Sequence, residues 1–83
     1  MLRNYKFEDA KNKDLYITVE SHYVKITDAK QAHWDSKKSD EIDDSILIEV
    51  GNGQEILSLI TSGVDEAEQF ALDILNLCQK IKH

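Results

Sequence analysis

The chain has 83 residues, with 10 basic and 16 acidic side chains, so its formal net charge is −6. That length is typical of one domain, and we expect residues 1–83 to form a single small domain. An acidic chain repels the phosphate backbone of nucleic acid and an anionic membrane surface, which argues against binding to either.

The cysteine content bears on the compartment. Cys78 is the one cysteine, so no internal disulfide can form, whereas small secreted domains usually depend on disulfides. No apolar run is long enough for a membrane-spanning helix. We therefore expect a cytoplasmic protein.

Three segments in the first third of the chain alternate in polarity as strands do. They are Asn4 to Glu8, Leu15 to Glu20 and His22 to Thr27. A hairpin with its tip at residues 20–21 would set Ile17 opposite Val24 and keep the apolar side chains on one face. This pattern predicts a strand followed by a tight hairpin.

Residues 28–45 hold six acidic side chains and few apolar ones. They are expected to form a polar acidic loop, with a short helical turn near Ala29 to Trp34. Trp34 has two interpretations: it folds back onto the core and pins the loop, or it is an exposed anchor for a partner.

A second hairpin is predicted from residues 46–60. Ile46 to Val50 and Ile56 to Ile60 are apolar, and Asn52-Gly53 between them favours a two-residue turn with positive φ. With that turn at the tip, Ile48 would pair with Leu57.

The C-terminal segment has the pattern of an amphipathic helix. Asp65 is a suitable N-cap, and the helix is expected from about Glu66 to Ile81. One broad apolar face then carries Ala67, Phe70, Ala71, Ile74, Leu75, Leu77, Cys78 and Ile81.

These elements predict an α+β fold, in which one C-terminal amphipathic helix packs across one face of an antiparallel meander of four to five strands. The helix then leaves the second face of the sheet without cover: either the sheet curls or the first strand and the acidic loop lie across this face, or it is a candidate interface. The candidate interface residues are Tyr16, Tyr23, Leu47, Ile56 and Ile60 on that face, together with Trp34 in the acidic loop.

No pattern indicates catalysis, a metal or a cofactor. Cys78 lies in the apolar stripe of the predicted helix, where a buried structural thiol is the expectation. His22, His33 and His83 lack the spacing of metal ligands, and the acidic residues between 35 and 44 lack the spacing of a calcium-binding EF-hand loop. We therefore expect a protein that is not an enzyme.

The function that fits these features is a small protein–protein interaction module. It would bind a protein partner or itself, and we expect a homo-oligomer that forms through one sheet face. The alternative is an acidic inhibitor or immunity-type protein that binds a basic site on a partner protein.

Overall fold

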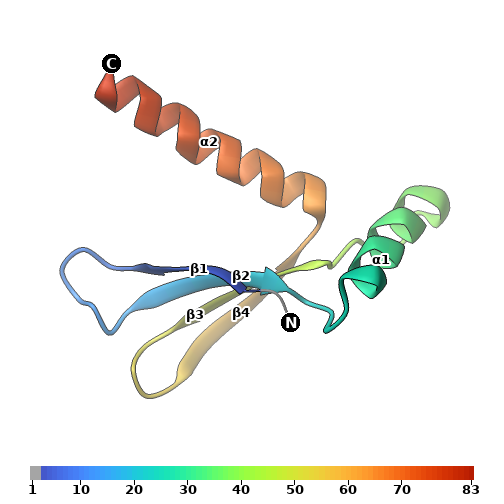
Figure 1. The fold of residues 1–83 in the computed structure, drawn as a ribbon, viewed down its shortest axis with the longest axis horizontal. Coiled ribbons are helices and arrows are strands. Elements are labelled where there is room, and N and C mark those ends of the chain that lie inside the picture. The colour runs from blue at the N-terminus through green and yellow to red at the C-terminus, as the bar shows by residue number, and fades with distance from the viewer. Residues whose placement is uncertain (1–2) are drawn as a thin grey trace.

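The computed structural model describes residues 3–83, with side chains from Lys6 onward. Its four strands form one antiparallel sheet in the order β1-β2-β3-β4, as Figure 1 shows with both helices. An α+β fold with an antiparallel meander is therefore confirmed, with four strands. The elements are β1 (Arg3–Glu8), β2 (Tyr16–Ser21), α1 (Ile26–Ser39), β3 (Ile46–Gly51), β4 (Ile56–Ser62) and α2 (Val64–Lys82).

The strand register gathers apolar side chains on one side of the sheet. Val19 pairs with Ile48, and Ile48 pairs with Ile60. Paired residues share a face, and residues two apart along a strand share it too. The face called here the apolar face carries Phe7, Ile17, Val19, Ile46, Ile48, Val50 and Ile60.

The other side of the sheet, called here the mixed face, is more polar. Thr18 pairs with Glu49, and Glu49 pairs with Leu59. Tyr16, Glu20 and Leu47 lie on this face as well. Alternation therefore places Glu20 and Glu49 on the mixed face and, apart from Leu47, the aliphatic residues of the two central strands on the apolar face.

The predicted strand over residues 22–27 is wrong. β2 pairs with β1 on one side and β3 on the other, and α1 begins at Ile26. The chain leaves the sheet after Ser21, whose Oγ lies 2.9 Å from the Tyr23 carbonyl oxygen. Both edges of β2 are already occupied, so this segment cannot pair with β2 as the predicted hairpin requires. The first strand near residues 4–8 is confirmed as β1, although the side chain of Tyr5 lies outside the described part.

The second hairpin forms with a different register from the one predicted. Ile48 pairs with Ile60 rather than Leu57, and residues 52–55 form a longer turn. The Asn52 side-chain oxygen accepts hydrogen bonds from the backbone N–H groups of Gln54 (2.8 Å) and Glu55 (2.9 Å). This side-chain turn replaces the two-residue turn, and no glycine adopts a positive φ.

The acidic loop is shorter than predicted, because residues 26–39 form α1. Asp28 in its first turn and Lys37 and Lys38 in its last turn suit the helix dipole. Asp40 ends the helix in the left-handed conformation, with φ of 57°. The predicted helical turn near Ala29 is therefore one part of a four-turn helix.

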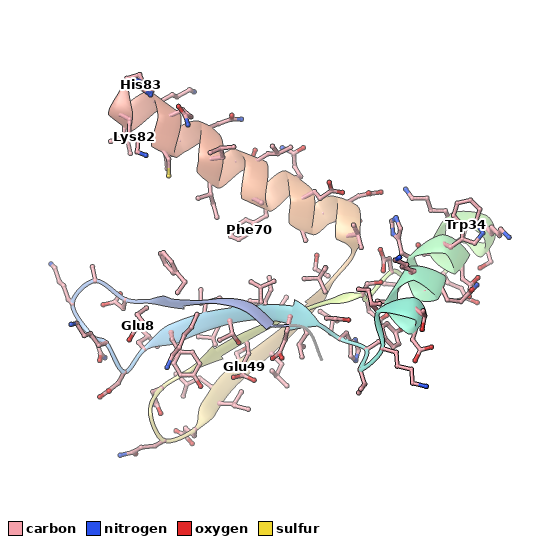
Figure 2. The ribbon with its side chains drawn as sticks, viewed as in Figure 1. Glu8, Trp34, Glu49, Phe70, Lys82 and His83 are labelled. Carbon is pink, nitrogen blue, oxygen red and sulfur yellow. The ribbon has the colours of Figure 1, made fainter. Side chains whose placement is uncertain are left out.

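The C-terminal helix α2 does not pack across the sheet of its own chain. It begins one residue after β4 ends and rises away from the sheet (Figure 1). None of its residues is buried. Phe70 projects from the side of α2 that is turned toward the sheet, whereas Glu49 lies on the far side of the sheet (Figure 2). The helix therefore overhangs the apolar face without covering it. Its N-cap is Gly63 rather than Asp65.

The described chain has almost no apolar core. Ala29 is the one buried apolar residue among those with a described side chain. The radius of gyration is 14.6 Å, compared with about 12 Å for a compact chain of this length. The accessible surface is 6675 Å², which is about 1,600 Å² more than a compact monomer of this mass exposes.

Candidate interaction surface

The first exposed apolar surface is one side of α2. The α2 stripe comprises Ala67, Phe70, Ala71, Ile74, Leu75, Leu77, Cys78 and Ile81, which recur at helical spacing. Ile81 is 77% exposed, and Phe70 and Leu77 are each 60% exposed. Side chains of this size are normally buried in a folded domain.

The second exposed apolar surface is the apolar face of the sheet. Phe7 on β1 is 63% exposed, and Ile60 on β4 is 50% exposed. β4 is an edge strand of the sheet, with β3 as its single neighbour. An uncovered apolar edge strand readily pairs or packs with another chain.

A pocket of about 330 Å³ borders the apolar face near the first residue of α2. Val19 and Ile46 line it from the sheet, Ala29 lines it from α1, and Val64 lines it from the first turn of α2. The pocket therefore lies where α1, α2 and the sheet converge. An apolar side chain from another molecule would find a partly formed site there.

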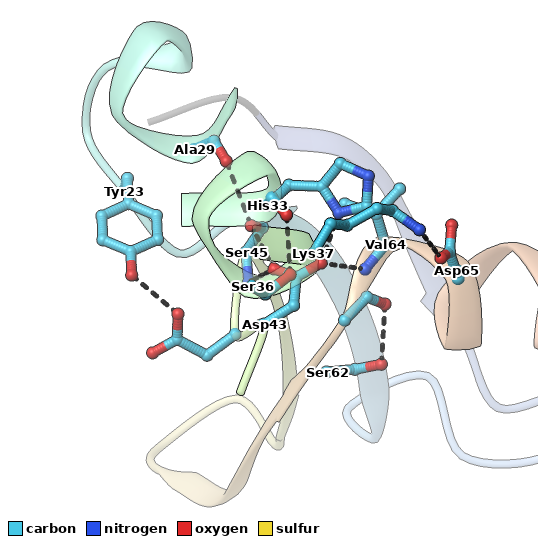
Figure 3. A network of polar contacts seen from close by, with 12 residues as sticks. Tyr23, Ala29, His33, Ser36, Lys37, Asp43, Ser45, Ser62, Val64 and Asp65 are labelled. Atoms are coloured by element: carbon cyan, nitrogen blue, oxygen red, sulfur yellow. Dashed lines mark hydrogen bonds and ion pairs between the residues drawn. The ribbon is translucent and has the colours of Figure 1, made fainter. Parts of the chain in front are cut away.

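Asp43 joins the three elements at this junction (Figure 3). Its Oδ2 accepts a hydrogen bond from the Val64 backbone N–H at 2.9 Å and lies 2.7 Å from His33 Nδ1. Its Oδ1 lies 2.5 Å from Ser45 Oγ and accepts from the Ser45 N–H at 3.1 Å. One carboxylate thus ties α1 to β3 and to the start of α2.

A second contact ties α1 to α2. Lys37 Nζ donates to Asp65 Oδ2 at 2.7 Å. The hydrogen bond with Asp65 raises the pKa of Lys37, and the same bond lowers the pKa of Asp65. Both side chains are exposed, so this ion pair orients the helix more than it stabilises the fold. The direction of α2 is therefore set by polar contacts at its base.

The hydrogen bonds at Asp43 control its ionisation. Burial raises the pKa of Asp43, but hydrogen bonds from Ser45, the Val64 N–H and His33 outweigh that effect and lower the pKa to about 2. The ionised form is favoured because every donor faces the carboxylate oxygens. Asp43 therefore contributes stability above its ordinary pKa of 3.8, and this contribution disappears as the pH falls from about 4 to about 2.

We expect Asp43→Asn to lower the free energy of unfolding by about 1–3 kcal/mol at pH 7, because an amide cannot accept from all of these donors. The difference between the variant and the wild type should shrink as the pH falls from 4 to 2. Urea unfolding at one fixed protein concentration across that pH range measures it. Asp35→Asn, which changes a half-buried carboxylate of α1 outside this network, is the control. A constant difference between Asp43→Asn and the wild type down to pH 2 would contradict the assigned role.

The strands separate the predicted interface residues instead of grouping them. Tyr16 and Leu47 lie on the mixed face, and Ile60 lies on the apolar face. Ile56 pairs with Gly51 beside a register shift, at the start of β4. The common face expected for these residues is therefore wrong, because the hairpin registers differ from those predicted.

Tyr23 and Trp34 lie off the sheet. The Tyr23 hydroxyl donates to Asp44 Oδ1 at 2.7 Å, and that hydrogen bond raises the pKa of the phenol. Trp34 lies on α1 and is 56% exposed, with Lys38 Nζ at 5.3 Å from the centre of its ring. Trp34 does not pin the segment to a core, and its role as an anchor stays a prediction.

Cys78 and His22 both lie at the surface. Cys78 is exposed rather than buried, because α2 has no cover in the single chain. His22 Nδ1 lies 2.9 Å from the Asp44 carbonyl oxygen. Within residues 3–83, no three His, Cys, Asp or Glu side chains form a group suited to a metal ion.

Comparison with known proteins does not identify a relative. No protein-family model, no curated protein and no solved structure matches the chain. In the part of the chain that is described, no helix combines the length and apolar character needed to cross a bilayer. The two apolar surfaces are therefore the features of the molecule from which a function can be inferred.

The network around Asp43 is the part of the site that sequence reasoning missed. Asp43 and His33 are ten residues apart, and Val64 follows Asp43 by 21 residues. No periodicity or motif links these positions, and the acidic neighbours of Asp43 resemble it in composition. Only the meeting of α1, β3 and α2 in space distinguishes it.

Proposed function

We propose that the chain is a non-enzymatic protein–protein interaction module that self-associates. Two copies associate so that the α2 stripe and the apolar face of each chain are buried between them. The observation that carries this proposal is the lack of a buried large apolar side chain in the described part of the single chain. A folded domain gains most of its stability from such burial.

The excess surface has the size that a permanent dimer requires. Each chain exposes about 1,600 Å² more than a compact monomer. Burying that excess on both copies would remove about 3,200 Å² in total, which falls in the range of obligate homodimers. At about 25 cal/mol per Å² of apolar surface, an area of this order strongly favours association.

A second copy fits these surfaces because each chain carries both halves of the contact. α2 has 19 residues and is therefore about 28 Å long. Strands of six or seven residues span roughly 20–24 Å. The helix and the sheet are thus similar in length, and a two-fold axis would bury the stripe and the apolar face of both copies at once.

We expect the wild type to sediment as a dimer at 10 µM, measured by analytical ultracentrifugation. Ile60→Lys should raise the dimer dissociation constant at least about a hundredfold, because an unpaired ammonium would enter the interface twice. Leu59→Lys is the matched control. It lies on the same strand with similar exposure, 56% against 50%, but on the mixed face.

Each outcome of this comparison is decisive. A monomeric wild type would refute self-association. Dissociation by Leu59→Lys with no effect of Ile60→Lys would move the interface to the mixed face, where Tyr16 and Leu47 lie. Dissociation by Ile60→Lys alone supports the proposed face.

A further inference from the structure

The α2 stripe is complementary to itself when two copies of the helix run antiparallel. Ile74 is at its centre, with Phe70 and Cys78 four residues away on either side, and Ala71 and Leu77 three residues away. A two-fold axis beside Ile74 would therefore place seven of the eight stripe residues level with stripe residues of the other helix, and Leu75 would lie level with Asp73. Helical spacing alone would allow the two-fold axis to lie beside several residues of the stripe. Side-chain size and charge must therefore decide which residue lies beside the axis.

Side-chain size selects the centre at Ile74. In that register Phe70 shares a layer with Cys78 of the second copy, and Ala71 shares one with Leu77 of the second copy. Ala67 likewise lies level with Ile81 of the second copy. Large residues thus meet small ones in each flanking layer, and this alternation fills the space between packed helices.

Charge selects the same alignment. The acidic Glu66 and Glu68 flank the start of the stripe, and the basic Lys80 and Lys82 flank its end. In the antiparallel arrangement the two lysines of one copy lie beside the two glutamates of the other, at both ends of the pair. A parallel arrangement would set glutamates beside glutamates and lysines beside lysines. Opposed helix dipoles also favour the antiparallel pair.

We propose that two copies of α2 pair antiparallel about Ile74 and that the last turn of each helix lies at the apolar pocket of the other copy. This inference rests on the proposed self-association and assigns its register. The pocket is lined by Val64 at the start of α2, and the antiparallel register brings the second copy's Ile81 to that end. Ile81 is the most exposed large apolar residue of α2, at 77%. The pocket of about 330 Å³ has ample room for an isoleucine side chain.

Disulfide cross-linking tests the register. In Ile74→Cys/Cys78→Ser, the two introduced cysteines would face each other across the axis, within the Cα separation of 4.4–6.8 Å that a disulfide requires. In the wild type, the two Cys78 residues would be about 12 Å apart along the helices, because they are eight residues out of step. We expect mild oxidation to convert most of the double variant to a covalent dimer and to leave the wild type unlinked.

Phe70→Cys gives a second, independent measurement. With the native Cys78 retained, each introduced cysteine would lie level with Cys78 of the second copy, and two disulfides would form per dimer. Within one chain, residues 70 and 78 are separated by about 12 Å along the helix, so an internal bridge is excluded. Mass spectrometry of the linked peptides identifies which cysteines have joined.

The possible results separate the register from the self-association. Cross-linking of the wild type through Cys78 would indicate a parallel pair and overturn the antiparallel register, while self-association would stand. A dimer by sedimentation in which neither engineered variant cross-links would also overturn the register. A monomer by sedimentation would refute the self-association itself. Cross-linking of both engineered variants but not of the wild type supports the proposal.

Discussion

Ile74→Asp should leave little folded protein at 25 °C. In the proposed dimer the two Ile74 side chains meet at the two-fold axis, so the substitution sets two carboxylates against each other in an apolar contact. A loss on the order of 5–10 kcal/mol per dimer is comparable with the total stability of a small protein. Circular dichroism should show loss of helix and strand signals, and sedimentation should show loss of the dimer.

The same substitution distinguishes a dimer from a stable monomer. In the single chain Ile74 is 49% exposed and α2 has no buried residue. If the single chain were the stable form, an aspartate there would change stability by only about 0.5 kcal/mol. Asn76→Asp is the control, since it adds a carboxylate on the opposite side of the helix and should leave both folding and the dimer intact. An unchanged melting temperature for Ile74→Asp would therefore rule out the proposed packing of α2.

Local patterns in the sequence identify most elements of this fold. Alternation predicts β1 and β2, two apolar runs around an Asn-Gly turn predict β3 and β4, and the spacing of apolar residues predicts α2 nearly end to end. The exception is α1, whose single buried residue is Ala29. A helix without a clear apolar stripe gives no periodic signal, and its composition matches that of an acidic loop.

Pairing between strands is harder to predict from local patterns. The segment from His22 to Thr27 alternates as a strand does, but both edges of β2 are occupied by other strands. The Asn52 side chain forms a longer turn than the Asn-Gly pair predicts, which shifts the partner of Ile48 to Ile60. Register depends on competition among all strands, which no short window of sequence contains.

The packing of α2 shows a second limit of prediction from the sequence. Its amphipathic pattern indicates that one side requires an apolar partner, and the pattern carries no information on which chain supplies that partner. Within one chain the polar contacts of Asp43 and Lys37 hold the base of the helix and leave the stripe uncovered. The stripe is therefore free to pack against a second copy, and the packing across its own sheet that the pattern predicts does not form.

Exchange of charges at the two ends of α2 should convert the self-pairing chain into one that requires a different partner. Glu66→Lys/Glu68→Lys would place lysines beside Lys80 and Lys82 of the second copy, at both ends of the pair. Each exposed contact of this kind is worth about 0.3–1 kcal/mol, and reversing all of them should weaken the dimer by on the order of 2–4 kcal/mol. That loss corresponds to roughly a 30- to 1,000-fold rise in dissociation constant.

If only the net charge of the chain mattered, the same double variant would form a stronger dimer. Each Glu→Lys change adds two charges, so the double variant would move the net charge from −6 to −2. Weaker general repulsion would then strengthen the dimer. A parallel helix pair would also predict no weakening, because its like charges would only change sign. Weakening of the dimer at low salt therefore identifies the antiparallel contacts, and it should largely disappear in 1 M NaCl.

The complementary variant, Lys80→Glu/Lys82→Glu, completes the experiment. Alone it should also dimerise poorly, since four glutamates would meet at each end of the pair. Mixed in equal amounts, the two variants should form a heterodimer in which every flanking contact is again between opposite charges. Any loss of helix stability from unfavourable charges at the helix ends is present in the separate variants and in the mixture, so it cancels in the comparison. Native mass spectrometry with one variant isotopically labelled distinguishes the heterodimer from both homodimers, because glutamate and lysine are too similar in mass to separate them otherwise. Equal amounts of dimer in the wild type and in Glu66→Lys/Glu68→Lys at low salt would refute the antiparallel pairing of α2.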